Sequence, residues 1–201
     1  MILEEFINIA IKNIINDYRC HIKKYTTEGD VIANLFAQLS HNKFKNLYIH
    51  SQVRPFKGNI GNEEVIIDGN WRKQEKANSG CIVDLAILDL QDKYWKKTIL
   101  KANKDQKIKR NSNEKTLKYW RILSYPVEAF HAAIEVKVRV KNNKSRIIKD
   151  IKKLSIIKRT NPKCLTYLII VDRCTSKKTI KNIQKYAERN RIKFYSNYSL
   201  P

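Results

Sequence analysis

Two apolar segments of the sequence contain charged residues that a buried strand rarely tolerates. Asp84 lies in "CIVDLAILDL" at 81–90, and Glu135 and Lys137 lie in "AAIEVKVRV" at 132–140. A carboxylate inside a buried strand costs several kcal/mol unless a cation pairs with it or a metal binds it. Because side chains i and i+2 of a strand share a face, Glu135, Lys137 and Arg139 are expected on one face, opposite the Ile and Val side chains.

These residue types suit the hydrolysis of a phosphodiester bond. Carboxylates on two adjacent strands can share a hard cation such as Mg²⁺, for which Mn²⁺ often substitutes, and the carbonyl of Val136 could supply a further oxygen. Such a cation stabilises the charge of the reacting phosphate and lowers the pKa of a water molecule. Lys137, on the same face as Glu135, could orient that water or neutralise the scissile phosphate.

The bland alternative is a half-solvated strand whose polar face meets water. An acid followed two residues later by lysine also occurs at Asp105-x-Lys107 and Asp150-x-Lys152. The first of these lies in a basic loop, and the second lies on a predicted helix, where i and i+2 do not share a face. Only the copy at Glu135 combines a strand pattern with an earlier strand that contains a buried Asp.

The elements that must position these residues follow from apolar periodicity. Helices are predicted at 4–18, 26–40, 145–159 and 176–190, with Thr27 and Ser176 as N-caps and Asp30 in capping-box position. Strands are predicted at 46–53, 63–68, 81–90, 132–140, 164–171 and 191–196. This order indicates a mixed α/β layer fold around a central sheet.

Length and composition suggest a single domain over 1–201, with an N-terminal helix at about 1–24 and a basic insertion at about 96–118. The four cysteines form no CxxC pair, and acids interrupt the apolar residues near the N-terminus. We therefore expect a cytoplasmic protein without disulfides, a zinc site or a membrane span.

The charge balance points to a polyanionic partner. Lys and Arg number 41 against 19 Asp and Glu, for a formal net charge of +22. Nucleic acid is the first candidate and an anionic membrane surface the second, although a compositional bias of the source genome is a third explanation. Trp71 is expected to pack in the core or at its rim, the alternative being stacking on bases. The predicted nucleic-acid contacts are Arg139, Lys141, Lys144, Arg146, Lys109 and Arg110.

Asp84, followed along the chain by Glu135-Val136-Lys137, resembles the motif of the PD-(D/E)XK nuclease superfamily, with Val83 in place of the usual proline. The resemblance spans roughly 25–196, and "EGD" at 28–30 with "YPVEAFHAAIEVKV" at 125–138 is most similar to restriction-endonuclease-like proteins. It implies an α/β, restriction-endonuclease-like three-layer fold with a central mixed β-sheet flanked by helices. It also implies that Glu28, in the first turn of an early helix, is an additional acid at the metal. Glu128, which precedes the strand, could be an outer group of the site instead.

On these grounds we expect a Mg²⁺-dependent DNA endonuclease that acts in restriction, phage defence or mobile-element biology. Its metal ligands would be Asp84, Glu135, the Val136 carbonyl and Glu28, and Lys137 would be catalytic. Two alternatives stay open: a structure-specific repair or recombination nuclease such as a junction resolvase, and a non-catalytic basic nucleic-acid-binding module. Double-strand cutting would need two sites, for which a homodimer is the simplest arrangement.

Overall fold

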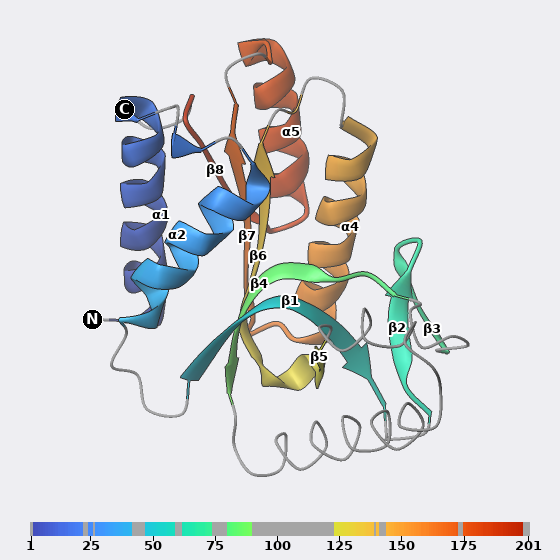
Figure 1. Ribbon diagram of the computed structural model, residues 1–201. Coiled ribbons are helices and arrows are strands. Elements are labelled where there is room, and N and C mark those ends of the chain that lie inside the picture. The colour runs from blue at the N-terminus through green and yellow to red at the C-terminus, as the bar shows by residue number, and fades with distance from the viewer. Residues whose placement is uncertain are drawn as a thin grey trace, which may run out of the picture.

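A mixed β-sheet of eight strands forms the centre of the computed structural model, with helices on both faces (Figure 1). Helices α1 and α2 cover one face, and α4 and α5 cover the other. The predicted class, α/β with a central mixed sheet flanked by helices, is confirmed. The structure describes residues 2–21, 24–25, 27–41, 47–58, 62–73, 80–89, 123–138, 140, 144–172 and 175–198.

The elements follow the predicted order along the chain. The helices are α1 (Leu3–Cys20), α2 (Glu28–Ser40), η3 (Val127–Ala129, a 3-10 helix), α4 (Lys144–Thr160) and α5 (Lys177–Arg189). The strands are β1 (Leu47–Lys57), β2 (Glu64–Ile67), β3 (Asn70–Lys73), β4 (Val83–Asp89), β5 (Leu123–Pro126), β6 (Phe130–Val138), β7 (Leu165–Val171) and β8 (Lys193–Ser196). Within the described residues, no helix is long and apolar enough to cross a membrane.

The strand order places the two charged segments side by side. The sheet runs β3-β2-β1-β4-β6-β7-β8, and β5 pairs with β1 outside this path. Strands β4 and β6 are antiparallel, with Leu85 opposite Ile134 and Ala86 opposite Ala133. One step further along this register, Asp84 and Glu135 lie next to each other.

Strand β6 is buried on both faces, so the alternative of a half-solvated strand with a polar face in water is wrong. Ile134 and Val136 belong to the apolar core between the sheet and helices α1 and α2. The opposite face is covered as well, because Glu135 is 1% exposed and Lys137 is 8% exposed. Water therefore does not solvate these two charges, and their partners must come from the protein.

The helix N-termini form at the predicted caps. Thr27 Oγ1 accepts a hydrogen bond from the Asp30 amide, and the Thr27 amide donates to Asp30 Oδ2 at 2.8 Å. This reciprocal capping box fixes the start of α2 and makes Glu28 its first residue. Ser176 caps α5 by accepting from the Thr179 amide.

Two strands were missing from the sequence-based prediction. β3 is polar and follows β2 through a tight turn in which Asp68 and Gly69 have φ angles of 48° and 83°. Both central residues of a type I′ hairpin turn need positive φ, and Asp-Gly is a sequence signal for it. β5 forms where only a connector was expected, because it pairs with β1 in parallel, a long-range contact that the local pattern does not encode. The basic insertion expected at 96–118 lies outside the described residues.

Candidate active site

The ammonium group of Lys137 lies among oxygen atoms from several elements of the fold. It donates a hydrogen bond to the carbonyl of its neighbour Val136 at 2.9 Å. Its Nζ also lies near Asp150 Oδ2 at 3.3 Å, Asp84 Oδ2 at 3.6 Å, Glu28 Oε2 at 3.7 Å and Glu135 Oε2 at 3.8 Å. We call these four acids, together with Lys137, the carboxylate cluster.

Four elements meet at the carboxylate cluster. Asp84 comes from β4 and Glu135 with Lys137 from β6, while Glu28 opens α2 and Asp150 lies in the second turn of α4. Asp84 Oδ2 accepts a hydrogen bond of 2.9 Å from the Val136 amide, which fixes the carboxylate across the two strands. The cluster therefore depends on the β4–β6 pairing and on the placement of one helix from each side of the sheet.

Lys153, also on α4, is the direct partner of the buried acid. Its Nζ lies 2.6 Å from Glu135 Oε1 and 3.1 Å from Asp150 Oδ1. It also donates to the carbonyl of Ile82 at 2.5 Å, and it is 5% exposed. Lys153 thus holds Glu135 and Asp150 in place beside Lys137.

The sequence analysis did not find Asp150 and Lys153. Asp150 was set aside because it lies on a helix, where it does not share a face with Lys152. One signal was available: Asp150 is the single acid among the eleven Lys and Arg residues of 137–163. An isolated acid in such a basic segment indicates a local use for its charge.

Burial and neighbouring charges set the protonation of the site. Burial raises the pKa of Glu135 well above its usual value, and Asp84 and Asp150 act in the same direction against Lys153 and Lys137. Burial alone would lower the pKa values of both lysines, but the surrounding carboxylates raise them, so that both lysines stay charged at neutral pH. With all four carboxyl groups ionised, they and the two ammonium groups would carry a formal excess of two negative charges. Protonation of Glu135, which its raised pKa favours, leaves an excess of one.

The oxygen atoms of the carboxylate cluster are of the type that a hard divalent cation accepts, but in this structure they surround the ammonium of Lys137. Carboxylate and carbonyl oxygens are the ligands that Mg²⁺ accepts in proteins. The position among them is taken by the ammonium of Lys137, at distances longer than the 2.0–2.1 Å of a typical Mg²⁺–oxygen bond. Within the described residues, no three His, Cys, Asp or Glu side chains are close enough together to hold a metal ion.

The predicted site residues fall into three groups. Glu28, Asp84, Glu135 and Lys137 come together, and the Val136 carbonyl contacts Lys137. Glu128 is exposed on η3, and the structure records no contact between its side chain and the carboxylate cluster. Lys144 and Arg146 are exposed in the first turn of α4. Outside the described residues lie Arg139, Lys141, Lys109 and Arg110.

Fold and site together define an α/β protein with a buried carboxylate–lysine cluster on its central strands. Among solved structures, NucC of P. aeruginosa ATCC27853 and NucC of E. coli MS115-1, each in a cAAA-bound form, are similar to it. Each likeness covers 93% of this chain and 73% of the other, at 10% sequence identity and a TM-score of 0.46. No protein-family model and no curated protein matches the chain. The functional argument therefore rests on the cluster itself.

Proposed function

We propose that this protein is a Mg²⁺-dependent DNA endonuclease that hydrolyses phosphodiester bonds, in restriction, phage defence or mobile-element biology. The observation that carries the proposal is the grouping of four acidic side chains and a backbone carbonyl around the Lys137 ammonium, with negative charge in excess. A structural ion pair needs balanced charge, whereas this excess suits a divalent cation together with a phosphodiester.

Asp84 and Glu135 would hold the Mg²⁺, with the Val136 carbonyl and Glu28 as further oxygen donors. When bound, the ion would stabilise charge on the reacting phosphate and favour ionisation of the attacking water. Lys137 would stabilise the negative charge that develops on the phosphate oxygens. Lys153 would keep Glu135 and Asp150 oriented through its contacts of 2.6 and 3.1 Å.

The same proposal assigns the polyanion implied by the net charge of +22 to DNA. Lys144 and Arg146, exposed at the start of α4, would contact phosphates, as would Arg139, Lys141, Lys109 and Arg110. Contacts of this kind position the nucleic acid without reading its sequence.

The direct test is nicking of supercoiled plasmid with Mg²⁺ or Mn²⁺ and with excess EDTA as the metal-free control. Asp84→Asn is a more specific test than Asp84→Ala, because its amide oxygen can still accept the hydrogen bond from the Val136 amide. We expect Asp84→Asn and Lys137→Met each to lower the rate by about 100-fold or more. Asp84→Asn would weaken the proposed Mg²⁺ site, and Lys137→Met would remove the cation that stabilises charge on the phosphate. Wild-type rates in both variants, with folding unchanged, would refute the site.

A substrate panel distinguishes the remaining functions. Linear duplex, single strand, plasmid and a four-way junction would each be incubated with the protein and Mg²⁺. Preference for the junction would favour a structure-specific recombination nuclease. Salt-sensitive binding of every substrate without cleavage would favour the non-catalytic module. Sedimentation with and without DNA would show whether two copies act together as a homodimer.

A further inference from the structure

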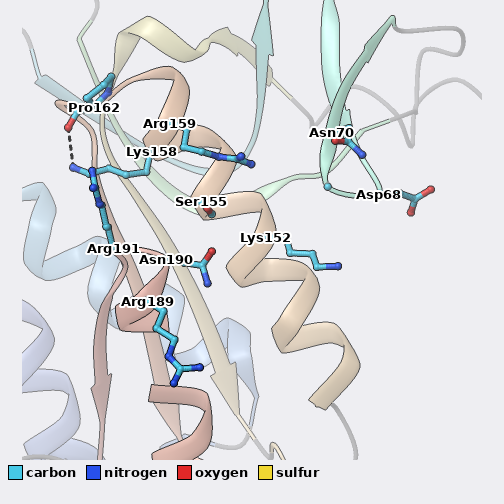
Figure 2. A pocket seen from close by; sticks show the side chains of 11 residues that line it. Asp68, Asn70, Lys152, Ser155, Lys158, Arg159, Pro162, Arg189, Asn190 and Arg191 are labelled. Atoms are coloured by element: carbon cyan, nitrogen blue, oxygen red, sulfur yellow. Dashed lines mark hydrogen bonds between the residues drawn. The ribbon is translucent and has the colours of Figure 1, made fainter. Parts of the chain in front are cut away.

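A basic groove of about 790 Å³ runs along the outer side of α4, apart from the carboxylate cluster. It lies between α4, the β2–β3 turn and the turn that follows α5 (Figure 2). Its described lining contains five Lys or Arg residues and one acid, Asp68. Figure 2 shows Lys152 and Arg159 extending from α4 and Arg189 from the last turn of α5.

The groove cations differ in what they already bind. Lys158 donates to the carbonyls of Pro162 and Cys164, both at 2.8 Å, so its charge supports the end of α4. Lys152, Arg159 and Arg189 are exposed, and within the described residues none of their side chains has an ion-pair or hydrogen-bond partner. Three cations from two helices thus line one groove, and the structure records no ion pair between them and Asp68, the acid in the groove lining.

The spacing of these cations suits an extended polyanion. Lys152, Ser155 and Arg159 recur at i, i+3 and i+7, which places them along one stripe of α4. At 1.5 Å per residue, Lys152 and Arg159 are separated by about 10 Å along the helix axis, so they can contact different phosphates of one strand. The stem of Lys152 packs beside Gly69 of the β2–β3 turn, so the groove edge on that side is built from backbone.

A smaller hollow of about 300 Å³ adjoins the groove and adds an aromatic surface. It shares Gly69, Asn70 and Arg159 with the groove and is also lined by Trp71. Trp71 is half-buried and packs against the core, as the sequence predicts, and part of its ring lines this hollow. The indole N–H of Trp71 donates to Thr160 Oγ1 at 2.9 Å, which fixes the ring relative to α4. A fixed aromatic ring beside unpaired cations is the combination that binds single-stranded nucleic acid, because bases stack while phosphates pair with the cations.

We infer that this groove binds a single strand of nucleic acid, with its phosphates along Lys152, Arg159 and Arg189 and one base against Trp71. The inference rests on the proposed function in one respect, namely that the ligand is a nucleic acid. It does not need the cleavage chemistry, because the groove and the carboxylate cluster have no residue in common. The groove would hold a strand outside the reaction centre and so fix how DNA is presented to the cluster.

Binding of a fluorescent oligo-dT is measured by anisotropy in EDTA over a range of salt concentrations, so that cleavage cannot contribute. The groove variant combines Lys152→Gln, Arg159→Gln and Arg189→Gln. The matched control combines Lys12→Gln, Lys178→Gln and Lys181→Gln, which removes three exposed lysines outside the groove. We expect the slope of log K against log salt to fall in magnitude by about 2 in the groove variant and by less than about 0.7 in the control.

Trp71 supplies an independent readout that charge does not affect. Trp71→Leu should weaken oligo-dT binding by about ten-fold with the salt slope unchanged, and Trp71→Phe, which keeps a stacking face, should restore most of the affinity. Equal slopes in the groove and control variants would overturn the inference. So would displacement of the oligonucleotide by thymidine monophosphate or inorganic phosphate at the same concentration, since the groove would then be a small-anion site. If the wild-type protein binds oligo-dT in the groove but does not nick plasmid with Mg²⁺ or Mn²⁺, the proposed function is refuted and the inference about the groove is not.

Discussion

Burial of Glu135 depends on Lys153, which is the nearest cation to its carboxylate. Glu135 is 1% exposed, and a carboxylate that is so fully buried is strongly destabilising without a charged partner. Lys153 is itself 5% exposed, so both charges have left water and neither is well solvated alone. The Glu135–Lys153 pair therefore contributes both to the stability of the fold and to the geometry of the carboxylate cluster.

Replacing Lys153 should destabilise the protein far more than replacing the lysine beside it. Lys153→Met leaves Glu135 buried without its cation, and we expect a loss of about 3–5 kcal/mol in the free energy of unfolding. Lys152→Met changes an exposed side chain of the same helix and should stay within about 0.5 kcal/mol of wild type. Urea unfolding at neutral pH measures both. Similar losses in the two variants would show that the 2.6 Å contact has no energetic consequence.

The chemistry-bearing residues were predictable where charge interrupts an apolar strand. Asp84, Glu135 and Lys137 stand out for this reason, and the structure brings them together. Asp150 and Lys153 were not predictable in the same way, because α4 carries charges around much of its circumference. Which of those charges faces the sheet depends on how the helix packs, a tertiary property that periodicity alone leaves open.

At the scale of single elements, the N-terminus of α2 determines where Glu28 lies. The capping box of Thr27 and Asp30 fixes the first helical residue, and Glu28 Oε2 then lies 3.7 Å from the Lys137 ammonium. Glu28 is more exposed than the other acids of the carboxylate cluster, with 41% of its side chain accessible. Its position therefore depends on the backbone of the helix more than on packing of the side chain.

Two matched cap substitutions separate helix stability from the site. Thr27→Ala and Ser176→Ala each remove an N-cap hydroxyl, from α2 and α5, and each should cost about 1 kcal/mol in the free energy of unfolding. Of the two, Thr27→Ala should slow plasmid nicking, by about ten-fold, because α2 carries a residue of the carboxylate cluster and α5 carries none. Unfolding midpoints and nicking rates would be compared for both variants. Equal nicking rates would remove Glu28 from the reaction.

Strong apolar patterns predicted element type well and helix rotation less well. In the sequence of α2, Ile32, Leu35, Phe36 and Leu39 recur at i, i+3, i+4 and i+7, a spacing that predicts one buried apolar stripe. The structure instead buries Val31, Leu35 and Leu39, while Phe36 is 37% exposed. The apolar side chains of α2 are spread around much of its circumference, so more than one face could have packed inward. Contact with α1 and the sheet decides which face does.

In the molecule as a whole, the carboxylate cluster is a small region of negative charge inside a strongly positive protein. The chain carries a net charge of +22, yet four acids converge on the central strands. A positive surface attracts DNA from solution, whereas a cluster of carboxylates repels phosphates unless a cation intervenes. Under the proposed function, DNA phosphates would approach the carboxylate cluster only with a divalent ion between them.

The adjacency of β4 and β6 that creates this centre is a property of the whole sheet. Periodicity identified both strands but contained no information on which strands pair, and the pairing was expected only from the resemblance to a nuclease superfamily. Sheet order arises from long-range contacts, such as those that place β1 between β2 and β4. A single sequence does not display these contacts, whereas it does display the charges that they bring together.

If a divalent ion relieves the charge excess, it must stabilise the whole fold, whatever its effect on catalysis. Mn²⁺ at 100 times its dissociation constant should raise the free energy of unfolding by about 2.7 kcal/mol, or the melting temperature by about 5–10 °C. Asp84→Asn and Glu135→Gln should each abolish this shift. Lys137→Met should enlarge it while nicking is lost, because removing the ammonium leaves the acids with more uncompensated charge and vacates the position at their centre. Thermal denaturation with Mn²⁺ or EDTA measures each shift, and a Lys137→Met protein insensitive to Mn²⁺ would show that the acids serve the lysine rather than a metal.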